Sequence, residues 1–493
     1  MNLPKRTRQQ PLLIDGEWID NTGHAIVSVN PANGEVNYEV SAASAREVAA
    51  AVESATRAAH APAWRHMLPH IRAGLLSKLA DIIASRAEDF WRAQMRENGK
   101  IAGECRAQAA SAVATFRYYA AVCETCGSDI TPARGSYISM TAYEPYGVVA
   151  AITPWNSPLT MEAQKVAPAL AAGNAVLLKP SEITPSAALE LGRAALDAGI
   201  PPGILNVLPG LGAVTGDALV RHPGVKMVTF TGGTDSGRRI AQIAAEKLMP
   251  VCLELGGKSP HILFADANID VAIRAVIGGI FEGSGQSCVA GSRLFVEHSV
   301  YDRVLSTLVE RAGAIRVDVP DAPDADMGPI SSFGHRDRIE RLVAAAKSEG
   351  ACIVLGGGRP SDSRLEAGAF YLPTILTNLE NSASICQQEI FGPVLCVLPF
   401  KNEDDLVQQA NDSVYGLAAG LWTSDYQRAW RVARSLDVGT IWLNTYKQLS
   451  ISTPFGGFKE SGIGREKGLG GFRLYQQAKG LYWGLDSPLR PTA

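Results

Sequence analysis

The sequence lacks several features that mark whole classes of protein. No apolar run approaches the roughly 20 residues that a membrane-spanning helix needs, and the basic opening PKRTRQQ is not followed by the apolar stretch of a secretory signal. The formal net charge is only −3, from 46 basic and 49 acidic residues. No excess of one charge therefore favours nucleic acid or an anionic membrane as a partner. We expect a cytoplasmic protein that binds neither.

Cysteine is sparse, with eight in 493 residues and no secretory signal, so a disulfide framework is not expected. Cys123 and Cys126 form a CxxC, but it lacks the second pair or the nearby histidines of a zinc site. Its surroundings, SAVATFRYYAAVCETCG, predict the C-terminal end of a helix instead. We expect no metal site.

The GxGxxG fingerprint of the conventional dinucleotide fold is also missing, because the last interval in PGLGAVTG (209–216) is one residue too long. Internal repeats, low-complexity tracts and long linkers are absent as well. What the chain does have is length and apolar material: 493 residues, 46% of them hydrophobic. This is enough for large cores in two to four domains.

Alternating strands and helices fill the middle of the chain. Five β-rich runs are separated by helical stretches: 147–152, 175–180, 205–209, 226–232 and 251–257. They are apolar on both faces, which is typical of a parallel sheet covered by helices on both sides. Such sheets bind ligands beyond the carboxyl ends of their strands. A second alternating region, 258–445, predicts a second α/β domain.

Outside these regions, helices are predicted over 44–60, 69–97 and 104–124, and LLIDGEWID reads as an early hairpin. Residues 126–146 and 472–493 are strand-like and belong to neither of the two alternating strand–helix regions. A strand such as KGLYWG must find a partner, because an exposed edge invites aggregation. Pairing with another subunit is one solution.

Several loops at predicted strand ends carry residues that suit chemistry. TFTGGTDSG (229–237) passes from a strand at Thr231 to a helix near Asp235, where backbone N–H groups favour phosphate oxygens. The alternative is a plain tight turn. In LLKPSEITP, Lys179 and Glu182 suit the hydroxyls of a ribose, although a solvated salt bridge is the commoner arrangement of such a pair.

LELGGKSP ends another strand with Glu254, an acid on an otherwise apolar run. Burial raises a carboxyl pKa, which suits a general base near neutral pH. The alternative is a carboxylate paired in the core. Cys252 shares its face of the strand and is more simply explained as a buried structural thiol.

Two further loops offer an amide and a thiol. Asn156 lies between prolines in TPWNSP, and a rigidly held amide is what an oxyanion needs, although capping of a turn explains it equally well. Cys288 lies in EGSGQSCVAG among small residues that allow close approach to the sulfur. It is either a nucleophile or an ordinary small hydrophobe. QEIFGPVL adds an acid, Glu389, and an aromatic, Phe391.

Seven motifs occur in order along nearly the whole chain: TPWN, LLKPSE, FTGGT, LELGGKSP, GQSC, EIFGPV and PFGGFKESGIGRE. Together they resemble the NAD(P)-dependent aldehyde dehydrogenase superfamily. The resemblance implies an α/β fold of two doubly wound Rossmann-like domains with a small β extension for oligomerisation. Residues 1–125 and 147–256 would bind the dinucleotide and 257–458 would carry the catalytic cysteine. Residues 126–146 and 470–493 would supply the oligomerisation strands of a homodimer or homotetramer.

The resemblance also implies roles for the catalytic residues. Cys288 would attack an aldehyde, with the oxyanion held by Asn156 and the Cys288 N–H. After hydride transfer to the nicotinamide, Glu254 would activate water to hydrolyse the thioester. This glutamate favours a free acid over transfer to coenzyme A. The role of Lys165, which matches a family lysine, stays open.

The cofactor positions follow in the same way. Lys179 and Glu182 would bind the adenosine ribose, Glu389 the nicotinamide ribose, and Phe391 would lie against the ring. Trp155, Gly232, Gly233 and Ser236 would lie near the pyrophosphate, although many relatives have a serine at the position of Gly233. Glu182 would repel a 2′-phosphate, which favours NAD, with NADP as the alternative.

Ser157, Gln164 and Leu449 occupy tunnel positions that are bulky or aromatic in several relatives. They argue against an aromatic box for quaternary ammonium aldehydes and predict a wider or more polar tunnel. Two other functions stay open: a cofactor-independent cysteine esterase or hydrolase, and a non-catalytic relative. The hydrolase would need a histidine base, and no histidine lies in the motifs of Cys288 or Glu254.

Overall fold

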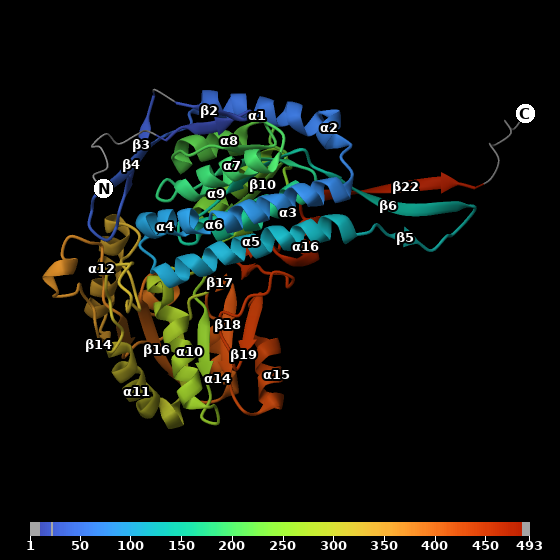
Figure 1. Ribbon diagram of the computed structural model, residues 1–493. Coiled ribbons are helices and arrows are strands. Elements are labelled where there is room, and N and C mark those ends of the chain that lie inside the picture. The colour runs from blue at the N-terminus through green and yellow to red at the C-terminus, as the bar shows by residue number, and fades with distance from the viewer. Residues whose placement is uncertain (1–9, 21–22, 486–493) are drawn as a thin grey trace, which may run out of the picture.

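The computed structural model describes residues 10–20 and 23–485. Two α/β bodies lie one above the other, and a narrow β-sheet projects from the first body (Figure 1). The opening basic stretch, apart from Gln10, and the last eight residues of the predicted 470–493 segment lie outside the described residues.

The first body is built on an eight-stranded sheet with the order β2-β1-β9-β8-β7-β10-β11-β21. Its strands are Leu12–Ile14 (β1), Glu17–Ile19 (β2), Val148–Ile152 (β7), Ala175–Lys179 (β8), Leu205–Val207 (β9), Met227–Thr231 (β10), Val251–Glu254 (β11) and Gly462–Ile463 (β21). Strands β9, β8, β7, β10 and β11 run parallel and are almost fully buried. The predicted hairpin, β1–β2, forms an antiparallel edge.

Two groups of helices pack on this sheet. Helix α6 contacts α7 and β8, with α3, α4 and α5 packed around them, whereas α1 and α9 contact strands of the sheet and join through α8. The helices of this body are Ala45–His60 (α1), Pro62–Arg65 (α2), Pro69–Ser85 (α3), Ala87–Asn98 (α4), Ala102–Thr125 (α5), Pro158–Ala171 (α6), Ser186–Ala198 (α7), Asp217–Arg221 (α8), Thr234–Glu246 (α9) and Gly468–Arg473 (α16).

The second body has a seven-stranded sheet with the order β14-β15-β16-β13-β12-β18-β19, parallel except for β14. Its strands are Pro260–Leu263 (β12), Arg293–Glu297 (β13), Cys352–Leu355 (β14), Thr374–Thr377 (β15), Val394–Phe400 (β16), Ala418–Trp422 (β18) and Thr440–Leu443 (β19). Its helices are Ile269–Phe281 (α10), Tyr301–Gly313 (α11), Phe333–Ser348 (α12), Ser384–Gln387 (α13), Glu403–Asn411 (α14) and Tyr426–Ser435 (α15). The sequence analysis did not identify β15.

Three small sheets complete the fold. The projecting sheet has the order β22-β6-β5, with β5 at Ile130–Thr131, β6 at Tyr137–Pro145 and β22 at Gln476–Gly484. Two hairpin-like pairs join β3 (Ala25–Val29) to β4 (Val36–Ser41) and β17 (Tyr415–Gly416) to β20 (Phe458–Lys459). The two doubly wound bodies and the extra β-sheet confirm the predicted fold class.

Local signals explain where several helices begin and end. Ser44 and Glu47 form a reciprocal capping box at the start of α1. Pro69 is the first residue of α3, where its missing N–H costs nothing. Cys123 lies in the last turn of α5 and Cys126 caps it, so the CxxC marks a helix end as predicted. In the described part of the chain, no helix combines the length and apolar character that crossing a bilayer demands.

Candidate active site

The loops that follow three neighbouring strands of the first sheet lie close together. Strands β7, β10 and β11 lie side by side and parallel, and Thr231 pairs with Glu254 at their carboxyl ends. The loops beyond them, together with residues of the second body, enclose a cavity of about 300 Å³. Its lining is Pro154, Trp155, Asn156, Met161, Thr231, Gly232, Gly233, Leu255, Gly256, Cys288, His335, Arg338, Glu389 and Phe391.

Cys288 enters this cavity from the second body, in the loop after α10 and a short turn at Glu282–Gly285. A side chain at Gly257 would meet the carbonyl oxygen of Cys288 at 2.4 Å, so the loop after β11 passes directly against it. Burial raises the pKa of the thiol to about 12, and Glu389 and Glu254 act in the same direction. Lys467 and the N–H of Val289 oppose this rise. The thiol at rest is therefore protonated.

Glu254 is the last residue of β11 and is 5% exposed. Burial raises its pKa well above the ordinary value, and the nearby Glu466 raises it further, against the opposing effect of Lys165. One carboxyl oxygen, Oε1, has no hydrogen-bond partner among the described residues. Among the described residues, Glu254 forms no ion pair within 4.0 Å.

Asn156 joins the loop after β7 to the loop that carries Cys288. Its Nδ2 donates a hydrogen bond to the carbonyl oxygen of Gln286 at 3.0 Å, and the side chain is buried. One amide hydrogen stays available, because Nδ2 carries two. The backbone N–H of Cys288 also has no hydrogen-bond acceptor among the described residues. Two donors thus remain available at the cavity: one amide hydrogen of Asn156 and the N–H of Cys288.

Glu389 lines the cavity and lies against the loop after β11. Its Oε1 accepts a hydrogen bond from the N–H of Gly257 at 3.0 Å, and burial raises its pKa to about 7. Arg338 of α12 donates to the carbonyl oxygens of Glu389 and Ile390, each at 3.0 Å. Phe391 adopts a left-handed backbone (φ 58°) and places its ring 5.2 Å from that of Trp155, edge to face.

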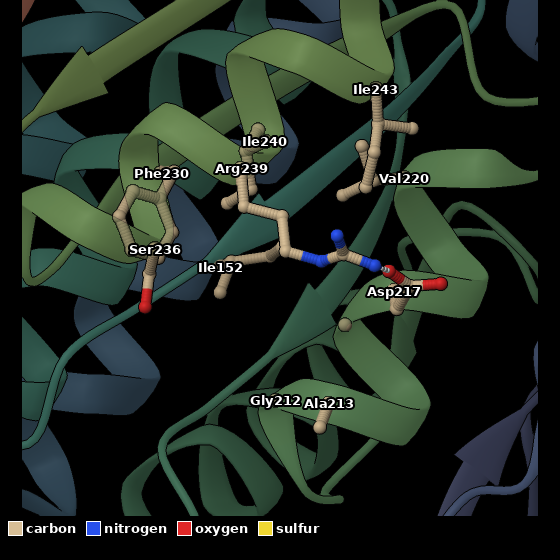
Figure 2. Close-up of a pocket in the computed structure, with 11 residues that line it drawn as sticks. Ile152, Gly212, Ala213, Asp217, Val220, Phe230, Ser236, Arg239, Ile240 and Ile243 are labelled. Carbon is tan, nitrogen blue, oxygen red and sulfur yellow. Dashed lines mark hydrogen bonds and ion pairs between the residues drawn. The ribbon is translucent and has the colours of Figure 1, made fainter.

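A second cavity of about 280 Å³ lies between α8 and α9, beside the same strands. Ile152, Phe230, Ile240, Ile243 and Val220 make its walls apolar, and Ser236, Gly212, Ala213 and Gly216 complete the lining with Asp217 and Arg239. Figure 2 shows Arg239 reaching from α9 toward Asp217, to which it donates at 2.9 Å. An apolar slot with a polar rim suits a flat heterocycle.

Lys179 and Glu182 lie outside the linings of both cavities. Lys179 is buried, donates to the carbonyl oxygen of Pro180 at 2.8 Å, and lies 3.8 Å from the half-exposed carboxylate of Glu182. A side chain at Gly216, in the lining of the second cavity, would contact the stem of Lys179. The pair therefore borders that cavity without entering it.

The residues predicted for a tunnel and for the deep core lie as follows. Ser157 accepts a hydrogen bond from Gln108 at 3.1 Å, Gln164 is buried, and Leu449 is half-exposed. Lys165 is completely buried, forms an ion pair with Glu466, and donates to Thr229 at 3.1 Å. Cys252 is also completely buried.

The structure therefore brings most of the predicted site residues together. Seven of them line the first cavity: Trp155, Asn156, Gly232, Gly233, Cys288, Glu389 and Phe391. Glu254 directly precedes Leu255 in that lining, and Ser236 lies in the second cavity. Three residues were not predicted from the sequence: His335 and Arg338, whose helix α12 contains no recognisable motif, and Lys467, which directly follows the last motif.

Comparison with known proteins agrees with this geometry. The aldehyde dehydrogenase family model matches residues 18–481. The chain belongs to the aldehyde dehydrogenase family. A betaine aldehyde dehydrogenase of Bacillus subtilis is 38% identical to this aldehyde dehydrogenase over 476 residues, which cover 96% of this chain and 97% of the relative.

Solved structures extend the likeness to the fold. A betaine aldehyde dehydrogenase from Staphylococcus aureus in complex with NAD+ is 36% identical, with a TM-score of 0.96 over 98% of this chain and 97% of that one. The NAD+ complex of an aldehyde dehydrogenase from Bacillus cereus is 36% identical, with a TM-score of 0.95 over 97% of both chains. The chain is accordingly an NAD-dependent oxidoreductase that oxidises aldehydes.

Proposed function

We propose that the first cavity oxidises an aldehyde to its carboxylic acid through a thioester on Cys288. The observation that carries the proposal is that one cavity is lined by a thiol (Cys288), an amide donor (Asn156) and the predicted nicotinamide-side residues. The buried carboxyl of Glu254 lies beside this cavity. These groups come from both bodies of the fold. The proposal assigns each a separate task.

The first task is addition to the carbonyl. An aldehyde has no leaving group, so it can lose hydride only after a nucleophile adds to its carbon. The sulfur of Cys288 forms the new C–S bond, and its proton passes to a base. Electrons of the C=O bond move to oxygen, where the second amide hydrogen of Asn156 and the N–H of Cys288 stabilise the charge.

The cofactor residues fit a dinucleotide. The apolar slot of Ile152, Phe230 and Ile240 suits adenine. The first turn of α9, which begins after the open Gly233, presents backbone N–H groups to phosphate. NAD+, when bound, supplies the acceptor for the hydride that leaves the former aldehyde carbon. Glu389 and Phe391 would hold and cover its nicotinamide end.

Glu182 supports NAD over NADP. Its carboxylate is half-exposed beside the adenosine end, where a 2′-phosphate would meet a negative charge. The attraction of buried Lys179 for such a phosphate opposes this effect, but Lys179 already donates to the carbonyl oxygen of Pro180.

Glu254 performs the second task, hydrolysis of the thioester. It takes a proton from water, the hydroxide oxygen bonds to the acyl carbon, and the C–S bond breaks to return the electron pair to Cys288. The raised pKa of Glu254 suits a group that must accept and release a proton within each turnover. The net reaction consumes aldehyde, water and NAD+ and yields acid, NADH and protons.

A cofactor-independent cysteine hydrolase remains the alternative, and the cavity does contain a histidine. His335, however, places Nε2 2.7 Å from the carbonyl oxygen of Phe391, and its ring packs against those of Trp155 and Phe391. With Nε2 donating to that carbonyl, Nδ1 is the nitrogen left to accept a proton, but among the described residues neither ring nitrogen forms a hydrogen bond with the Cys288 sulfur. The geometry therefore supports the dehydrogenase.

We also propose that β22 and β6 form a contact between subunits of a homodimer or homotetramer. Tyr482 and Trp483 on β22 are 74% and 70% exposed, and Ile130 on the neighbouring β5 is 75% exposed. Exposed apolar groups on a projecting sheet are typical of interfaces. The names of relatives suggest betaine aldehyde as a substrate. Gln164 and Leu449, however, stand at positions that are often aromatic in relatives, and Ser157 stands at a bulky one, which argues against binding of a quaternary ammonium.

The experiment is a panel of aldehydes with NAD+, followed by absorbance of NADH. We expect turnover with at least one aldehyde, and its loss in Cys288→Ala with NAD+ binding retained, because the nucleophile is gone while the cofactor residues remain. Ester cleavage without cofactor and no NADH from any aldehyde would instead indicate the hydrolase. Neither signal would indicate a non-catalytic relative.

A further inference from the structure

Lys467 lies directly after the buried Glu466 and brings a positive charge to the Cys288 end of the cavity. The residue is 7% exposed, and its Nζ lies 5.4 Å from the ring centroid of Phe455. Phe455 and Cys288 pack on the same small cluster, formed by Val289, Leu417, Ala418, Trp442 and Tyr446. The ammonium group therefore lies beside Phe455, which packs on the same cluster as Cys288.

This charge has no partner within the described residues. No carboxylate oxygen lies within 4.0 Å of Nζ, and no acceptor is in hydrogen-bond range. The nearest acid in sequence, Glu466, is already paired with Lys165. Burial lowers the pKa of Lys467, and the nearby Glu466, Cys288 and Glu254 oppose this effect without forming an ion pair with it. A buried ammonium without a counter-ion is costly, so an arriving anion would satisfy it.

We infer that Lys467 binds an anionic group of the substrate, and that the substrates are short aldehydes carrying a carboxylate. The inference rests on the proposed role of Cys288 and specifies its substrate class. The charge of Lys467 attracts such an aldehyde and repels a cationic one such as betaine aldehyde.

Lys447 provides a matched control. Lys447 is also mostly buried, and Cys288 affects its pKa. Unlike Lys467, it has partners: its Nζ donates to the carbonyl oxygen of Gly278 at 3.0 Å and lies 3.9 Å from Glu282. Its charge is thus already partnered within the protein. We expect Lys447→Met to keep the preference for anions and Lys467→Met to lose it.

The first experiment needs no turnover. Cys288 is alkylated with iodoacetate or with neutral iodoacetamide, and the labelled Cys288 peptide is measured by mass spectrometry; in each reaction sulfur displaces iodide and its proton goes to solvent. We expect the rate ratio of iodoacetate to iodoacetamide to fall about tenfold in Lys467→Met, the loss of one charge-assisted contact. Lys467→Arg should retain the ratio and shows that the fold tolerates a change here.

The second experiment compares kcat/KM for succinic semialdehyde, butanal and betaine aldehyde. We expect Lys467→Met to lower the value for succinic semialdehyde alone. An unchanged alkylation ratio would overturn the inference. An equal fall with both reagents would also overturn it, because Lys467 would then act on the thiol. A ratio that falls as expected in a protein that oxidises no aldehyde would leave the anion site standing and overturn the dehydrogenase proposal.

Discussion

At the residue scale, the site depends on groups whose protonation the fold has shifted from ordinary values. Burial raises the pKa of both Cys288 and Glu254 and so favours the protonated form of each. In the proposed mechanism, attack requires the sulfur to lose its proton, and water activation requires Glu254 to be deprotonated. Both steps therefore become easier as the pH rises.

Exchange of Glu254→Gln tests the second of these steps. Glutamine cannot accept the proton from water, so we expect one burst of NADH per Cys288 and then steady turnover about 10²- to 10⁴-fold below wild type. Stopped-flow absorbance measures the burst. In the wild type, the rate of thioester hydrolysis should rise with pH as Glu254, whose pKa is raised, loses its proton. This rise should be absent in the variant. Steady turnover at the wild-type rate would rule out Glu254 as the base.

At the element scale, the site is formed where short loops follow parallel strands. The loop from β11 to β12 is the clearest case, because it supports three features at once. It follows Glu254, it donates to Glu389 through the N–H of Gly257, and it passes against the carbonyl of Cys288. Its two glycines allow this approach because neither carries a side chain.

Gly257→Ala should therefore displace Cys288. Its Cβ would lie 2.4 Å from the carbonyl oxygen of Cys288, so one of the two loops has to move. A shift of about 1 Å is enough to cost roughly 10²-fold in kcat/KM, which the NADH assay measures. Gly74→Ala in α3 is the control, because an added Cβ there meets nothing within 4 Å. Equal activity of the two variants would contradict the packing argument.

At the scale of the whole molecule, the sheet of β5, β6 and β22 stands away from both bodies (Figure 1). Its strands pair along nine residues between β22 and β6, yet most side chains of β22 are exposed. A long exposed strand with aromatic side chains normally pairs or is covered. This is the physical reason for proposing that it holds subunits together.

The double exchange Tyr482→Ser and Trp483→Ser should weaken that assembly. Removing the two aromatic groups deletes apolar contact area without touching either cavity, so light scattering should show a smaller average mass at equal concentration. Trp430→Ser is the matched control, since Trp430 is 66% exposed on α15 in the second body. The interface would lie elsewhere if both variants had the wild-type mass.

The sequence predicted most of the fold and much of the site because the informative signals were local. The five parallel strands of the first body appear as apolar runs, and TFTGGTDSG begins a helix at Thr234, within one residue of the prediction. Strand β15 was not predicted because TILT has only two apolar residues, Ile375 and Leu376, between two threonines. His335 and Arg338 were not predicted as site residues for a different reason. Only the packing of α12 against the loop of Glu389 brings them into the cavity. The catalytic and cofactor roles themselves stay predictions.

Strand β21 has a consequence for biosynthesis. Residues 462 and 463 return from the second body to pair with β11, and Glu466, just beyond them, meets Lys165 some 301 positions earlier. The carboxyl of Glu254 therefore reaches its final surroundings only after residue 467 has left the ribosome. A nascent chain halted before that point would hold Cys288 and Glu254 in an unfinished setting, so the proposed reactive centre depends on residues near the end of the chain.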